Sequence, residues 1–158
     1  MKIAIGADHA GYELKEKLKD YMKSEGYDVV DLGPNEYEPG DDYPMYAAPV
    51  ARMVGDGEVE RGVLVCDSGI GVDIVANKIS GVRSALVHDE ELAKLTRMHN
   101  NTNVLSLGAM FVDDEKAKRI VKNWLETDFS HGDRHVRRIN EIEELEEQEV
   151  RDECSAWD

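Results

Sequence analysis

The sequence has few cysteines and no long apolar run. Cys66 and Cys154 are the two cysteines among 158 residues, which excludes a disulfide framework. Neither lies in a CxxC motif or at a spacing to histidine that is typical of zinc sites. No apolar stretch approaches the roughly 20 residues of a membrane-spanning helix, and residues 1–7 lack the layout of a signal peptide. We therefore expect a cytoplasmic protein without a membrane partner.

Positive charge is also scarce. Lys and Arg number 19 against 34 Asp and Glu, a net charge of −15, which argues against nucleic acid as a partner. We interpret residues 146–158 as an acidic C-terminal tail, either a solvated helix face or disordered, after one domain over residues 1–145. Just before the tail, Arg134, His135, Arg137 and Arg138 form a basic cluster that requires an anion or the carboxylates of a partner.

Strand and helix patterns alternate from the first residue onward. Apolar strands are predicted at residues 2–5, 28–32, 63–66, 84–87 and 104–107, and helices at 12–22, 44–54, 72–79, 90–98 and 116–125. This order predicts an α/β fold, a Rossmann-like three-layer sandwich with a five-stranded parallel sheet. An extra C-terminal helix from about residue 134 has a thin apolar stripe that suits a subunit interface: Ile139, Ile142 and Leu145.

Loops at the carboxyl ends of parallel strands are where such folds bind ligands. The loop over residues 66–71 has the clearest chemistry, because Gly69 and Gly71 let backbone amides approach a ligand and a helix follows. Such a loop stabilises a phosphate, an enolate or a thiolate. Cys66 would then be a reactive base or nucleophile, although a small buried residue at a strand end is an equally good interpretation.

Commoner phosphate-binding loops are excluded. A phosphatase loop needs an arginine where Val72 stands, a Walker loop needs Lys-Ser/Thr after Gly71, and no GxGxxG follows the first strand. Other polar residues allow both a binding and a purely structural interpretation when each is considered alone. Arg134 and Arg138 share a helix face and could clamp one anion, or could form a solvated face toward the acidic tail.

Taken in order, these pieces resemble the family of ribose-5-phosphate isomerase type B and the galactose-6-phosphate isomerase subunits. The similarity covers nearly everything up to about residue 140. The segments that carry it are residues 5–15, 42–44, Cys66 with 69–71, then 76–78, 81–83, 99–105, 107–109 and 134–138.

The resemblance implies an aldose–ketose isomerase of a small sugar phosphate, of the ribose 5-phosphate type, that needs no metal and no organic cofactor. Cys66 matches the base that moves a proton between C1 and C2 through a cis-enediolate. Ser68 matches a hydroxyl that shuttles the oxygen-bound proton, and Asp8 and His99 match residues that bind the sugar and open its ring. The matching substrate-binding residues are His9, Asp67, Gly69, Ile70, Gly71, Asn100, Arg134 and Arg138.

The resemblance also implies a homodimer or a dimer of dimers. The active sites would lie at the subunit interface, with His99 and Asn100 contributed by the neighbouring subunit.

Three positions depart from the family pattern. Asp67 replaces a glycine, Asp73 replaces a neutral residue, and Met110 replaces an arginine that touches the phosphate. They leave open another phosphosugar as substrate, such as tetrulose 4-phosphate, galactose 6-phosphate or allose 6-phosphate. A non-catalytic sugar-phosphate-binding protein is a further alternative, and a nucleotide-binding signalling domain is the weakest.

Overall fold

The computed structural model describes residues 1–155, with side chains for residues 1–149. Its strands are β1 (Lys2–Ala7), β2 (Asp28–Asp31), β3 (Arg61–Cys66), β4 (Ser84–Leu86) and β5 (Val104–Gly108). A short 3-10 helix, η1 (His9–Gly11), precedes the six helices. These are α1 (Tyr12–Ser24), α2 (Pro44–Gly55), α3 (Ile70–Ala76), α4 (Glu90–Asn100), α5 (Asp114–Glu126) and α6 (Asp133–Ser155).

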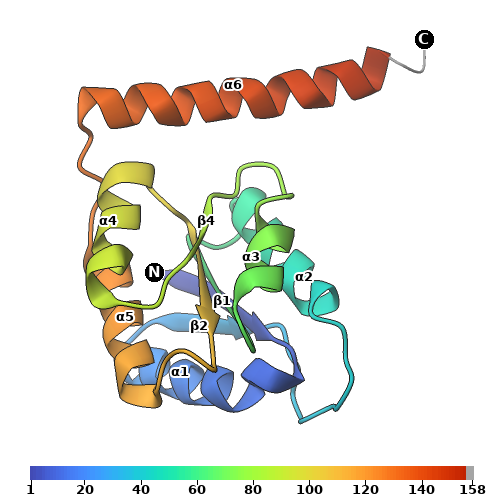
Figure 1. Ribbon diagram of the computed structural model, residues 1–158, viewed down its shortest axis with the longest axis vertical. Helices are drawn as coiled ribbons and strands as arrows, with labels where there is room; N and C mark the ends of the chain where they lie inside the picture. Colours follow the sequence, from blue (N-terminus) through green and yellow to red (C-terminus); the bar gives the residue numbers. More distant parts are fainter. Residues whose placement is uncertain (156–158) are drawn as a thin grey trace.

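The predicted three-layer sandwich is confirmed. The strands form one parallel sheet in the order β2-β1-β3-β5-β4. Helices α1, α4 and α5 cover one face and α2 and α3 cover the other (Figure 1). The strand order reverses between β1 and β3, and this topological switch point is where open α/β sheets bind ligands.

Two apolar cores follow from the alternation of side chains along the strands. Ile3 and Ile5 of β1 face the larger core, which holds the fully buried Trp124 of α5. Ala4 faces the second core, under α2 and α3, which also contains Cys66. Cys66 is thus buried at the end of β3, and its neighbours on this face are apolar.

Among the predicted helices, α3 differs most from the prediction. We expected a helix over residues 72–79, but α3 begins at Ile70 because Gly69 turns the chain in a left-handed conformation with φ of 78°. It ends at Ala76, where the side-chain amide of Asn77 donates to the carbonyl oxygens of Asp73 and Ser84. Ile70 and Gly71 are therefore helical residues.

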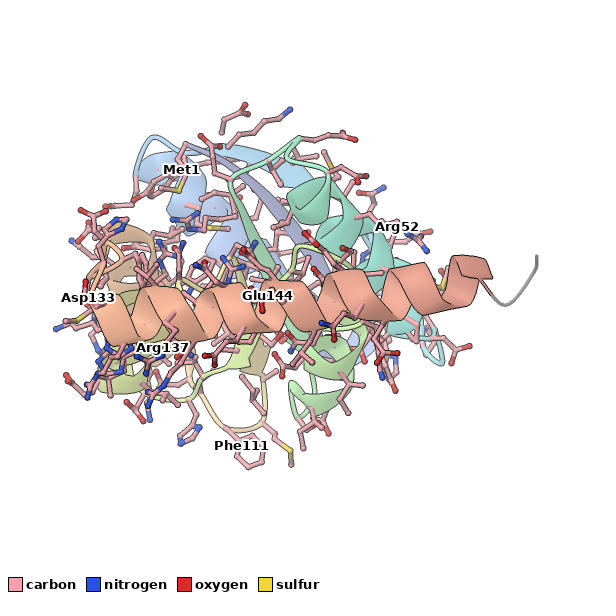
Figure 2. All side chains as sticks on the ribbon, turned by 90° about the horizontal axis from the view of Figure 1, so that it is seen from above. Met1, Arg52, Phe111, Asp133, Arg137 and Glu144 are labelled. Carbon is pink, nitrogen blue, oxygen red and sulfur yellow. The ribbon has the colours of Figure 1, made fainter. Side chains whose placement is uncertain are left out.

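Helix α6 crosses the amino-terminal edge of the sheet and extends beyond it (Figures 1 and 2). The Glu146 carboxylate accepts the Gly81 N–H at 2.9 Å, and that of Glu143 lies 3.4 Å from Arg83 Nη1. Ile139 is buried, whereas Ile142 and Leu145 are exposed. The helix continues past residue 145 through much of the expected acidic tail; residues 156–158 and the Cys154 side chain lie outside the described part.

No helix in the described part of the chain is both long enough and apolar enough to cross a membrane.

A fully buried lysine ties α1 to the loop after β2. Lys15 Nζ lies 2.9 Å from both Asp31 carboxylate oxygens and 2.6 Å from the Pro34 carbonyl oxygen. Burial raises the pKa of Asp31, but hydrogen bonds from Lys19, Lys15 and the Gly33 amide outweigh it and leave this pKa below its ordinary value. The ion pair therefore stabilises the fold at neutral pH.

We predict that Asp31→Asn lowers the free energy of unfolding by about 2 kcal/mol, because it removes one of the two carboxylates, Asp31 and Glu16, that pair with the buried Lys15 ammonium. The depressed pKa of Asp31 means that the stabilisation is present at neutral pH and is lost as the pH falls below about 4. Urea denaturation at pH 7 and pH 3 measures both effects. Asp28→Asn, on the same strand but exposed, is the control; equal losses in the two variants would contradict the prediction.

Candidate active site

The predicted site residues form two groups at opposite edges of the sheet. Asp8, Cys66 and Ser68 follow β1 and β3, so they lie at the carboxyl edge. His99 and Asn100 end α4, which runs back against the strands, and the Asn100 carbonyl accepts from Arg83, just before β4. They therefore lie at the amino edge. The five residues of β5 separate the two edges by about 16 Å, so one chain does not bring the two groups together.

At the carboxyl edge, Asp8 is fixed between two strands. Its backbone amide donates to Val65 O at 3.3 Å, and one carboxylate oxygen caps η1 by accepting the Gly11 N–H at 3.0 Å. The side chain is buried, and this burial raises the pKa of Asp8 above its ordinary value. A carboxyl group of this kind is suited to proton transfer to a sugar oxygen.

Cys66 lies beside Asp8 at the switch point. Its Sγ accepts a hydrogen bond from the Gly69 N–H at 3.1 Å, and its carbonyl oxygen accepts from the Ala109 N–H at 2.9 Å. The thiol is thus held by the loop that follows it. Two features require glycine at position 69: its φ is 78°, and a Cβ would lie 2.4 Å from Leu86 Cδ1.

Ser68 and Asp67 line different pockets. Ser68 contributes to one of about 350 Å³, together with Ile70, Leu86, Val87, His88, Gly108, Phe111 and Lys116. Asp67 and Met110 contribute to one of about 290 Å³, together with Ala10, Glu13, Leu14, Lys17, Ala109, Val112 and Asp114. Asp67 and Met110, two of the three departures from the family pattern, therefore line the same pocket. The lining of this pocket combines the carboxylates of Asp67, Glu13 and Asp114 with the Lys17 ammonium.

The third departure, Asp73, is part of a hydrogen-bond network beneath the loop. Its carboxylate accepts from Ser84 Oγ at 2.7 Å, and Ser84 Oγ lies 3.0 Å from Ser106 Oγ. These contacts attach α3 to β4 and β5. The Asp73 carboxylate thus fastens the helix after the Cys66 loop to the sheet.

His9 is paired with a carboxylate that the sequence analysis did not single out. Asp41 Oδ1 lies 2.7 Å from His9 Nδ1 and also accepts the His9 backbone N–H at 2.9 Å. The hydrogen bond that His9 donates to the Asp41 carboxylate raises the pKa of His9 above its ordinary value. Burial raises the pKa of Asp41, but the His9 hydrogen bonds more than compensate and lower it. The available signal was its position next to residues 42–44, one of the family-like segments.

At the amino edge, His99 of α4 stacks on His135 of α6, with ring centroids 4.4 Å apart and an angle of 11° between the planes. Arg134 Nε donates to His135 Nε2 at 3.4 Å. Burial, followed by the nearby His99, Arg134 and Arg138, lowers the pKa of His135. The sequence analysis placed His135 in the basic cluster but not among the site residues; the structure makes it the contact that holds α6 against α4.

Among the residues that the structure describes, no three His, Cys, Asp or Glu side chains are arranged to hold a metal ion.

Comparisons with known proteins agree with this geometry. A family model described as Ribose/Galactose Isomerase matches residues 3–142. Ribose-5-phosphate isomerase B of Escherichia coli is 41% identical over 146 residues, which are 92% of this chain and 97% of that protein. D-erythrulose-4-phosphate isomerase of Pectobacterium atrosepticum is 41% identical over 135 residues, 84% of this chain and 87% of the relative.

A solved structure adds a ligand to the comparison. The crystal structure of ribose-5-phosphate isomerase B from Mycoplasma genitalium, with bound ribulose-5-phosphate, superposes with a TM-score of 0.89. The two chains are 42% identical, and the match covers 92% of this chain and 96% of the other. This similarity extends over the whole sheet and both groups of polar residues.

We predict that His135 titrates below pH 6.5 and that Arg138→Gln raises its midpoint, because the substitution removes a nearby like charge. Chemical shifts of the imidazole C–H protons against pH measure this. Arg137→Gln is the control, since the exposed Arg137 lies 3.7 Å from Glu141. A wild-type midpoint above 6.5, or identical shifts in the two variants, would contradict the arrangement.

Proposed function

The chain belongs to the Ribose/Galactose Isomerase family, and on this basis we propose that it interconverts ribose 5-phosphate and ribulose 5-phosphate. The observation that carries the proposal is the position of Cys66, whose Sγ lies at the switch point and accepts the Gly69 N–H at 3.1 Å. The ribulose-5-phosphate bound to the Mycoplasma genitalium protein supports this substrate.

In the proposed reaction, the Cys66 thiolate removes the proton on C2 of the open-chain aldose. The electron pair moves into a C1–C2 double bond, and the cis-enediolate that forms receives the proton back on C1 as the ketose. The oxyanion would be stabilised by backbone amides of this loop other than those of Gly69 and Ile70, which donate to Cys66 Sγ and Ser68 Oγ. Ser68 Oγ, which accepts the Ile70 N–H at 3.3 Å, moves the proton between the two oxygens.

Opening of the sugar ring requires an acid that protonates the ring oxygen and a base that removes the proton of the anomeric hydroxyl. Asp8 is a suitable acid, because burial favours its protonated form. His99 is the expected second group, but in one chain it lies at the far edge of the sheet. We infer that the neighbouring subunit supplies it.

The separation of the two edges thus supports a homodimer or a dimer of dimers with composite sites. Each site would combine Asp8, His9 and the Cys66 loop of one subunit with His99 and Asn100 of the next. Arg134 and Arg138, at the start of α6, belong to the amino-edge group and would hold the phosphate. The exposed apolar side chains of α6, Ile142 and Leu145, suit contact with that subunit.

A second candidate is isomerisation of a different phosphosugar. It is favoured by the 41% identity to D-erythrulose-4-phosphate isomerase and by Met110, a neutral side chain where the family commonly has an arginine. Galactose 6-phosphate and allose 6-phosphate are further possible substrates of the same mechanism. A protein that binds phosphosugars without reaction is the remaining alternative.

We predict that Cys66→Ala lowers kcat by about 10³-fold, because it removes the general base, while the affinity for the phosphosugar changes little. Isomerisation of ribose 5-phosphate, erythrulose 4-phosphate, allose 6-phosphate and galactose 6-phosphate would be followed by NMR, with binding measured by calorimetry. Cys66→Ser is the conservative companion variant. Turnover that survives in both variants would exclude Cys66 as the base. Binding without turnover by the wild type on every sugar would favour the non-catalytic alternative.

We also predict complementation between two inactive variants. If each site takes Cys66 from one subunit and His99 from another, Cys66→Ala and His99→Ala are each inactive alone. Mixed after unfolding and refolding together, they should recover about a quarter of wild-type turnover, since half of the dimers are hybrids with one intact site in two. A mixture that stays inactive while hybrids form would place both residues in the same subunit's site.

A further inference from the structure

We propose that Asp41 is a positioning residue that fixes His9 for the phosphate group of the substrate. The inference rests on the proposed function: by resemblance, His9 belongs with Arg134 and Arg138 to the residues that bind the phosphate of the phosphosugar. Asp41 lies in the loop between β2 and α2, 32 residues from His9 in the chain.

Asp41 holds both the backbone and the ring of His9. A single oxygen, Asp41 Oδ1, accepts both the His9 backbone N–H and the ring Nδ1–H, at 2.9 and 2.7 Å. Two hydrogen bonds to the same acceptor fix the backbone and the ring together. Because the ring nitrogens lie on different sides of an imidazole, the carboxylate at Nδ1 leaves Nε2 free to face a ligand, and in the cationic form of His9 the Nε2–H is a donor. The His9 side chain is 34% exposed, so a ligand can reach it.

The Asp41 side chain and the loop that carries it are also fixed by their surroundings. The Asp41 side chain is 2% exposed, and Tyr46 of α2 lies close to it. The start of the same loop is fastened by Lys15, which donates to the Pro34 carbonyl oxygen at 2.6 Å, and by Tyr12, which donates to the Asn35 carbonyl oxygen at 3.3 Å. The carboxylate therefore stays beside His9 without a ligand.

The charges around His9 favour its cationic form. Asp8 and Asp41 are the charges that act on the ring, and Tyr37 contacts its edge with centroids 6.3 Å apart. The hydrogen bond that His9 donates to Asp41 more than compensates for burial and raises the pKa of His9. A cation at this position has particular value here, because Met110 supplies no positive charge to the phosphate.

This arrangement gives phosphate binding a defined pH dependence. Since the pKa of His9 is raised, the ring is fully protonated well below pH 6.5 and loses its charge as the pH rises through the raised value. Without the Asp41 charge, the same loss occurs at lower pH.

Asp41→Asn tests the proposal, because it keeps the shape and an acceptor oxygen while it removes the charge. Glu38→Gln is the matched control, an exposed carboxylate of the same loop. The probe is inorganic phosphate, titrated against each protein while the His9 C–H signals are followed by NMR from pH 5 to 9. We expect Asp41→Asn to lower the His9 midpoint by about one pH unit and to weaken phosphate about tenfold at pH 7, with Glu38→Gln close to wild type.

Turnover provides the second measurement. Asp41→Asn should raise KM for the phosphosugar about tenfold and change kcat much less, since it acts on binding of the phosphate rather than on the proton transfer. An unchanged His9 midpoint or unchanged phosphate affinity in a folded Asp41→Asn protein would overturn the inference. Absence of turnover in the wild type would sink the proposed function alone, because the phosphate titration still tests the role of Asp41.

Discussion

The pairing of β1 with β3 is the constraint on which the rest of the structure depends. The two strands end side by side, with Ala7 opposite Val65, so the residues that follow them, Asp8 and Cys66, leave the sheet at neighbouring points. The chain turns away tightly after β1, and a Cβ on Gly11 would lie 2.4 Å from the Val65 carbonyl oxygen. A larger residue would push η1 and α1 away from β3, and the Asp8 carboxyl group away from the Cys66 thiol with them.

In this strongly acidic protein, a few polar contacts hold the elements that carry the candidate site residues. The buried Lys15 binds Asp31 and the Pro34 carbonyl oxygen, and this fastens the loop that carries Asp41 to His9. At the other edge, the His99–His135 ring stack fastens α6 to α4. An ion pair at one edge and a ring stack at the other thus hold candidate substrate-binding side chains, while most of the excess carboxylates are exposed.

The fold was predictable from the sequence because its strands are short apolar runs and its helices have clear apolar faces. The polar residues at strand ends, Asp8 and Cys66, followed from the rule for open sheets. Asp41 did not, since its partner His9 is distant in sequence and the intervening loop has no periodicity. The start of α3 was also missed, because a left-handed Gly69 begins the helix earlier than the apolar pattern does. Likewise, no spacing along the chain indicates that Cys66 and His99 lie at opposite edges.

The division of polar residues between two edges has a consequence for the newly made chain. If the site is composite as proposed, a single folded subunit holds the thiol and Asp8 but lacks His99, the second group for opening the sugar ring. Such a subunit would then be inactive until it meets a second copy. Synthesis and folding can then be complete before any catalysis begins, and at low concentration the rate falls with the square of the subunit concentration instead of in proportion to it.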